Sequence, residues 1–303
     1  MFVQSERFIE MHEHRKGKIS IFGQESNPTT HKLAKMNLAI RGIDAKIELG
    51  DTLMNDKFPE LKVDYVIANP PFNVSDYNIN KAETHKWKYG IPPTGNANYA
   101  WLQHFISKLA PYGTAGIVLA NGSMSSEIAT EGQIRKELIE NDLVDCMVAL
   151  PSQLFYNTQI PACLWFLARN KTETTKFRNR TNEILFIDAR ELGTMISRKQ
   201  KELTEKDIVT ISNTYHNWRE KNAKTTYNDI AGFCKSATIE DVRKNNYILT
   251  PGRYIDFKEA EDDGVGFDDK MKQLTKTLKE QMQKVAELDN TIKNNLKKIG
   301  YEI

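Results

Sequence analysis

Apolar residues along the first two thirds of the chain alternate between short strand-like runs and longer segments with helical spacing. The runs predict strands at residues 19–22, 45–49, 63–68, 115–119, 144–150, 162–167 and 183–188, and the periodic segments predict helices at 2–14, 27–42, 99–109 and 131–141. Such alternation is typical of a doubly wound, mostly parallel α/β sheet. The strands at 144–150 and 162–167 have no helix between them, so we expect an antiparallel finish to the sheet.

The pattern changes after the last predicted strand, which divides the chain into three parts. Residues 1–190 form the predicted α/β core, and residues 191–257 read as a mixed, mostly helical extension. Residues 258–303 carry apolar side chains at spacings of three and four, namely Met271, Leu274, Leu278, Met282, Val285, Leu288, Ile292, Leu296 and Ile299. This stripe predicts a coiled-coil-like helix, packed either on its own domain or on a partner helix.

Composition narrows the class of protein. With 40% hydrophobic and 27% charged residues, the chain can build a core and is not disordered. The net charge of +2 gives no global attraction to nucleic acid, so a DNA-active protein would need a local basic patch or a partner. Three cysteines without a CxxC pair indicate neither a disulfide framework nor a metal site. We find no signal peptide and no membrane-spanning run, and expect a cytoplasmic protein.

The predicted strand at 63–68 ends in the sequence Asn69-Pro70-Pro71-Phe72. Ligands of open α/β sheets bind outside the carboxyl ends of the strands. The Asn69 side chain and the Pro70 backbone each offer a carbonyl that can accept a hydrogen bond from an amine, and the prolines make the turn rigid. Phe72 can stack on a base that has left the duplex. The motif thus predicts methyl transfer to an exocyclic amine, whereas the structural alternative is a rigid turn whose Phe72 fills the core.

Two acidic residues, Glu25 and Asp51, follow two other predicted strands. A carboxylate at such a position commonly accepts hydrogen bonds from ribose hydroxyls, and Asp51 could accept one from an adenine amine. Taken singly, a carboxylate in a turn is more often a helix cap or a solvated charge. Together with the Asn69–Phe72 motif they predict an S-adenosylmethionine-dependent amino-methyltransferase. The amine could belong to a DNA base or, alternatively, to a protein glutamine modified at N5.

Several motifs in a fixed order resemble the modification subunit of type I restriction-modification systems, an adenine-N6 DNA methyltransferase. They occupy residues 21–30, 49–53, 67–73, 95–101, 120–126, 150–156, 249–254 and 297–302, so the resemblance covers nearly the whole chain. It implies a Rossmann-like methyltransferase sheet with a helical C-terminal extension. It also implies that Glu25 binds the cofactor ribose and Asp51 its adenine. Asn69, Pro70, Pro71 and Phe72 would form the catalytic turn, with Asn69 also facing the cofactor.

The resemblance further implies partners. Family members act on DNA together with a specificity subunit that reads the sequence, a second modification subunit and a motor-nuclease subunit. The stripe at 258–303 would then dock on the specificity subunit. A non-catalytic assembly module that uses only this helix is a further alternative, distinguished by partner binding that survives Asn69→Ala.

One expected feature is missing from the sequence. Family members carry a Gly-rich Asp-Pro-x-Cys-Gly-x-Gly-Gly loop before a segment similar to Met1–Glu6, but Gly17 is the only glycine upstream of Phe22 here. We therefore expect the first strand of the sheet and an N-terminal helical domain to be absent. The flanking strands would keep unpaired edges, so we expect low stability and weak cofactor binding.

Overall fold

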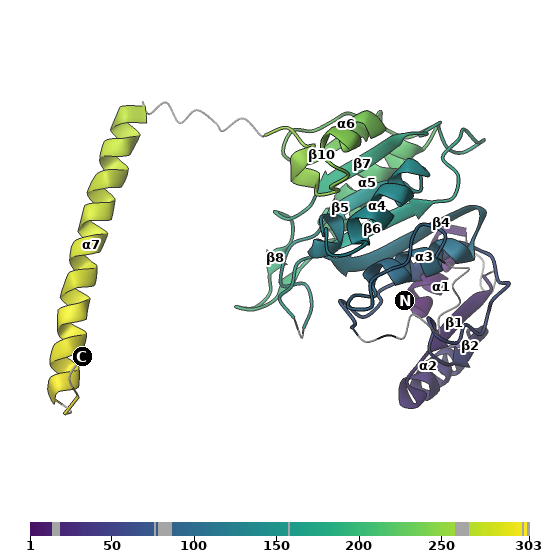
Figure 1. Ribbon diagram of the computed structural model, residues 1–303, viewed down its shortest axis with the longest axis horizontal. Coiled ribbons are helices and arrows are strands. Elements are labelled where there is room, and N and C mark those ends of the chain that lie inside the picture. The colour runs from purple at the N-terminus through teal and green to yellow at the C-terminus, as the bar shows by residue number, and fades with distance from the viewer. Residues whose placement is uncertain are drawn as a thin grey trace. The chain divides into compact units, whose positions relative to one another are not determined.

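The computed structural model describes residues 1–13, 19–75, 77, 87–156, 158–257, 267–298 and 300–301. The chain forms two compact units, Met1–Phe257 and Lys258–Ile303, and each is described here by itself (Figure 1). The larger unit contains the sheets, and the smaller contains one long helix. No helix among the described residues combines the length and apolar character needed to cross a bilayer.

The core of the larger unit is a six-stranded sheet in the order β10-β7-β5-β6-β4-β3. Its strands are β3 (Val63–Ala68), β4 (Leu109–Ala120), β5 (Val144–Ala149), β6 (Ala162–Ala168), β7 (Glu183–Asp188) and β10 (Cys234–Thr238). β6 runs antiparallel to both of its neighbours, β4 and β5, and β10 runs antiparallel to β7, while the remaining pairs are parallel. The predicted α/β class and the antiparallel arrangement of β5 and β6 are therefore confirmed, but the sheet is mixed, with two parallel and three antiparallel pairs, and not mostly parallel as expected.

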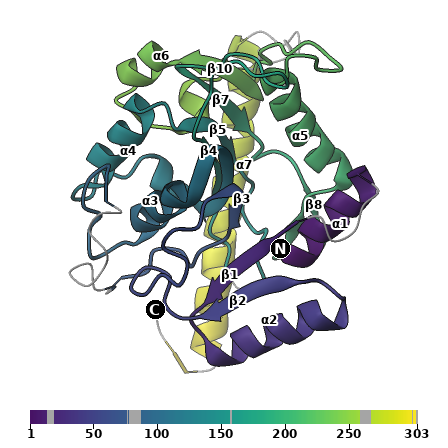
Figure 2. The same cartoon turned by 90° about the vertical axis from the view of Figure 1, so that its right-hand side faces the viewer.

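Helices cover both faces of this sheet because its central strands are apolar on both faces. On one face α3 (Asn98–Lys108) and α4 (Glu131–Glu140) bury residues such as Tyr99, Leu102 and Ile134 against Trp165. On the other, α5 (Glu205–Arg219) buries Tyr215 and Trp218 in a second cluster with Cys146, Val148, Leu185 and Ile187. Figure 2 shows α3 and α4 on one side of β4 and β5, with α5 on the other. The result is a three-layered α/β/α core.

The first two strands form a separate sheet, which the strand pattern alone did not indicate. β1 (Ile21–Glu25) and β2 (Ala45–Leu49) pair in parallel, joined by α2 (Pro28–Ile40), whose N-cap Asn27 accepts hydrogen bonds from two backbone amides of the first turn. α1 (Phe2–Glu13) precedes them. Among the described residues, β1 pairs only with β2 and β3 only with β4.

The segment between the core and the tail is more closely integrated than a mostly helical extension would be. It supplies α5, α6 (Ile239–Lys244) and the short hairpin β8 (Thr194–Met195) and β9 (Lys201–Glu202). It also supplies β10, whose five residues pair with β7 and complete the six-stranded sheet. Alternation in Cys234–Thr238 is short and partly polar, so the periodicity did not reveal a strand. The division at residue 190 stays a prediction.

The smaller unit consists of α7 (Phe267–Lys298), a helix of 32 residues in which none is buried. The predicted stripe is present on it, and seven of its members, from Met271 to Ile292, are between 46% and 65% exposed. Ile299, the last member, lies outside the described residues. An apolar seam of this length is typical of a helix that packs on another helix or on an apolar surface.

Candidate active site

The turn after β3 lies at the carboxyl edge of the six-stranded sheet, where the fold class places its ligands. Within the turn Asn69 and Pro71 are exposed, Pro70 is buried and Phe72 is half-buried. A buried proline fixes the backbone, and the adjacent amide remains accessible to a ligand. The next residue, Asn73, has a φ of 51°, so the chain leaves the turn in the left-handed region. The turn is therefore rigid, and its exposed Asn69 lies directly after the carboxyl end of β3.

Phe72 has a neighbour to which the sequence assigned no role. Its ring meets the ring of Phe155 edge to face, with 5.8 Å between the centroids. Phe72 also packs against the core cluster below, which agrees in part with the alternative that it fills the core. Phe155 lies in the segment 150–156, which resembles a family motif, and this was the available signal. The adjacent Gln153 has a φ of 65°, and its carbonyl accepts a hydrogen bond of 2.9 Å from the Lys201 amide.

Glu25 and Asp51 follow the carboxyl ends of two paired strands. β1 and β2 are parallel with Glu25 opposite Leu49, so both acids emerge at the same edge. One Glu25 oxygen accepts a hydrogen bond of 2.8 Å from the Asn27 amide. One Asp51 oxygen accepts from the amides of Leu53 (2.9 Å) and Met54 (3.0 Å). Among the described residues, nothing donates to the second oxygen of either carboxylate, so each acid shapes its own turn and keeps an acceptor for a ligand.

Gln24 joins the two acidic turns, a role that sequence reasoning missed. Its side-chain amide donates to the carbonyl of Asn55 (2.8 Å) and accepts from the amide of Lys57 (3.0 Å), which ties the end of β1 to the loop after β2. The Gly50 amide adds a hydrogen bond of 3.0 Å to the Glu25 carbonyl. Two carboxylate acceptors on adjoining, cross-linked turns fit a ribose and an adenine amine.

The two groups of site residues lie on different sheets, and Lys108 connects the regions that carry them. Lys108 is the last residue of α3 and is 8% exposed. Its ammonium donates to the Asp56 carboxylate and, at 2.6 Å, to the Phe58 carbonyl, both in the loop after β2. The charge is paired where it is buried, which is the condition under which a buried lysine is tolerated. The loop that follows Asp51 is thus attached to the helix that packs on the six-stranded sheet.

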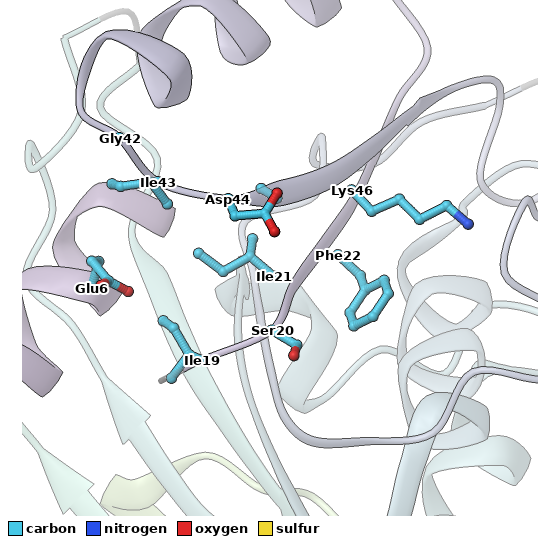
Figure 3. A pocket seen from close by; sticks show the side chains of 10 residues that line it. Glu6, Ile19, Ser20, Ile21, Phe22, Gly42, Ile43, Asp44 and Lys46 are labelled. Atoms are coloured by element: carbon cyan, nitrogen blue, oxygen red, sulfur yellow. The ribbon is translucent and has the colours of Figure 1, made fainter. Parts of the chain in front are cut away.

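A cavity lined by described residues lies elsewhere. It has a volume of about 520 Å³ and is lined by residues that include Glu6, Ser20, Asp44 and Lys46 (Figure 3). Ser20 and Asp44 precede β1 and β2, so the cavity is at the amino ends of these strands. Glu25 and Asp51 are at the opposite ends. The cavity is therefore separate from the predicted cofactor site.

Comparison with known proteins adds a family to this geometry. The sequence pattern of the N-6 DNA methylase family matches residues 1–263. The HindI methylase subunit of a type I restriction enzyme from Haemophilus influenzae is 51% identical over 304 residues, covering 99% of this chain and 66% of the relative. The MjaIX methylase subunit from Methanocaldococcus jannaschii is 42% identical over 94% of this chain and 51% of the relative. The chain thus spans between half and two thirds of the length of these curated relatives.

Solved structures agree at the level of the fold. The methyltransferase subunit of a type I restriction-modification system from Streptococcus thermophilus has a TM-score of 0.69 at 28% identity, over 82% of this chain and 51% of that one. The EcoKI M protein has a TM-score of 0.66 over 99% of this chain and 67% of that one, and at 18% identity it supports the fold alone. The HindI, MjaIX and Streptococcus thermophilus relatives are, by name, methylase or methyltransferase subunits of type I restriction systems, so the glutamine alternative gains no support from them.

Proposed function

Because this chain belongs to the N-6 DNA methylase family, we propose that it transfers a methyl group to the N6 amine of an adenine flipped out of DNA. The observation that carries the proposal is the turn Asn69–Phe72, in which a buried Pro70 fixes the backbone while Asn69 stays accessible at the sheet edge. A planar base extruded from the duplex can reach such an edge, whereas a stacked base cannot.

The residues of the turn act on the amine by orientation and charge. The Asn69 side-chain carbonyl and the Pro70 backbone carbonyl accept its two hydrogens, which directs the nitrogen lone pair away from the turn. S-adenosylmethionine supplies an electrophilic methyl group when bound. As the nitrogen bonds to the methyl carbon, the carbon–sulfur bond breaks and its electron pair stays on sulfur. The nitrogen gains positive charge, which the two carbonyl dipoles would stabilise until one amine proton passes to solvent. Phe72 supports the plane of the base.

Glu25 and Asp51 would hold the cofactor. The second oxygen of each carboxylate is the acceptor that a ribose hydroxyl and an adenine amine require, and Gln24 fixes the two turns relative to each other. Carboxylates at the ends of adjoining parallel strands serve this purpose in nucleotide-binding α/β folds. Binding in this position needs no metal ion.

Sequence recognition would come from another chain. The net charge of +2 provides little general attraction for DNA, so a partner that grips the duplex is required. The exposed stripe of α7 fits docking on an apolar helical surface, and we assign it to the specificity subunit of a type I complex. A second copy of this chain and a motor-nuclease subunit would complete the assembly.

The test is methyl transfer to DNA by the chain in complex with a specificity subunit. We expect Asn69→Ala to reduce transfer by at least about 100-fold while cofactor affinity stays within about twofold. Asn141→Ala is the matched control, because this exposed asparagine ends α4 at the opposite edge of the sheet and bonds only a helix carbonyl, at 2.8 Å. Equal loss of transfer and cofactor binding would make Asn69 a structural residue, and transfer to protein in place of DNA would contradict the proposal.

A further inference from the structure

The residue that follows the catalytic turn is held by a reciprocal pair of hydrogen bonds. The Asn73 amide donates to the side-chain oxygen of Asn98 at 3.2 Å. The side-chain nitrogen of Asn98 donates back to the side-chain oxygen of Asn73 at 2.9 Å. Both polar groups of the Asn98 side chain are thus used on a single residue. That residue is the one whose backbone lies in the left-handed region, with a φ of 51°.

Asn98 is well placed to impose this conformation because it is itself fixed. It is 2% exposed and begins α3, in which Tyr99, Ala100 and Leu102 are fully buried. Its own amide donates to the Asn96 side chain at 3.0 Å. The Ala97 amide donates to the Val74 carbonyl at 2.9 Å, so a backbone hydrogen bond between the neighbouring residues joins the same two segments. The start of a core helix is therefore fastened to the exit of the turn at three points.

We infer that Asn98 is a positioning residue, which holds the turn Asn69–Phe72 in its active geometry by keeping Asn73 left-handed. Few non-glycine residues adopt this region; asparagine tolerates it better than most, and the bonds from Asn98 hold Asn73 there. Released from Asn98, Asn73 would relax toward an ordinary φ, and the change would rotate the chain directly after Phe72. This inference rests on the proposed function for its catalytic consequence, but the contact itself does not.

The contact is tested by amide hydrogen exchange on the chain as it stands. We expect Asn98→Ala to speed exchange at Asn73 and at Ala97 by about five- to thirtyfold, the range for the loss of one or two neutral hydrogen bonds. Asn98→Asp keeps the acceptor for the Asn73 amide but loses the donor. It should therefore protect Asn73 better than the alanine variant does. This second variant covers the case in which Asn98→Ala does not fold.

Gln103→Ala is a matched control. Gln103 is on the same helix, is 1% exposed, and uses its side chain in the same way on another loop, accepting from the Tyr89 amide (3.0 Å) and donating to the Gly90 carbonyl (2.8 Å). Its loss should destabilise the chain to a similar extent and leave exchange at Asn73 unchanged. If both variants alter Asn73 equally, or if Asn98→Ala leaves Asn73 protected, the inference is wrong.

The catalytic consequence is tested by rescue in the complex used for methyl transfer. Asn98→Ala should lower kcat by roughly tenfold or more with little change in the KM for DNA, since it disturbs orientation and not binding. Adding Asn73→Gly should restore most of the rate, because glycine adopts a positive φ without assistance. A slow double variant would overturn the positioning role. Absence of transfer by the unsubstituted complex would instead count against the proposed function, and the exchange result would still decide the contact.

Discussion

Cofactor binding can be attributed to one carboxylate by replacing Glu25 with alanine. In the structure Glu25 uses one oxygen on the Asn27 amide, at 2.8 Å, and keeps the other for a ligand. The substitution removes both, so its effect on binding has to be separated from its effect on the start of α2. Asn27→Ala makes that separation, because it removes the cap that accepts from Thr29 and Thr30 but keeps the Glu25 side chain.

The expected magnitudes differ between the two variants. A hydrogen bond from a ribose hydroxyl to the remaining oxygen of Glu25 is worth roughly 1.5 to 3 kcal/mol, the range for charged acceptors. Its loss should raise the Kd for S-adenosylmethionine by roughly 10- to 100-fold. Loss of the Asn27 cap costs about 1 kcal/mol of unfolding free energy and should leave the Kd within about twofold.

Isothermal titration calorimetry with S-adenosylmethionine, paired with urea denaturation of each variant, provides the measurement. The reasoning is refuted if Asn27→Ala weakens binding as much as Glu25→Ala, because the carboxylate would then act only through the local fold. It is also refuted if Glu25→Ala binds as well as the unsubstituted chain. Absence of binding by the unsubstituted chain would mean that the two turns alone do not make a cofactor site.

Three further predictions concern stability and assembly. Hydrogen bonds from Arg243 lower the pKa of Glu140 from its usual 4.5 to about 2. The Glu140–Arg243 pair therefore stabilises the fold fully above about pH 4.5, and this stabilisation is lost as the pH falls toward 2. Glu140→Gln should thus cost up to about 1 kcal/mol at pH 7 and nothing near pH 2, measured by denaturation. Burial raises the pKa of Glu131, which favours its neutral form, so Glu131→Gln should be more stable than the unsubstituted chain at pH 7 and equal to it at about pH 3.5. Leu278→Glu with Leu288→Glu should leave the helix content seen by circular dichroism unchanged and weaken binding of the specificity subunit more than about tenfold, whereas full binding would remove α7 from the interface.

The local pattern of apolar and polar residues predicted the helices and strands well, but it did not predict which strands pair with one another. The strands at 45–49, 63–68 and 183–188 have the predicted bounds, because each is a short apolar or alternating segment between turn residues. β4 begins at Leu109 and not at the predicted residue 115. The prediction was too short because Pro111 and Gly113, near the start of the strand, are residues typical of turns. That β6 lies between β4 and β5 depends on pairing between distant segments, about which periodicity is silent.

The same distinction applies to the site. Asn69, Glu25 and Asp51 could be identified because their residue types and their positions after strands are visible in the sequence. Gln24 and Asn98 could not, because their roles depend on partners 31 to 33 and 25 residues away. The role of a side-chain amide next to a turn cannot be assigned from the sequence, because the amide can donate and accept, and its partners are seen only in the structure.

The motif strand shows where the rigidity of the site comes from. Five of the six residues of β3 are apolar, which is typical of a strand buried on both faces, yet Tyr65 and Ile67 are 71% and 55% exposed. In the part of the chain that the structure describes, β3 pairs on one side only, so its own hydrogen bonds fix the turn that follows it less firmly than those of a central strand would. The contacts beyond the turn, Phe72 with Phe155 and Asn73 with Asn98, therefore become the principal restraints on its geometry. A search for residues that tune this site should begin with those contacts and not with the strand.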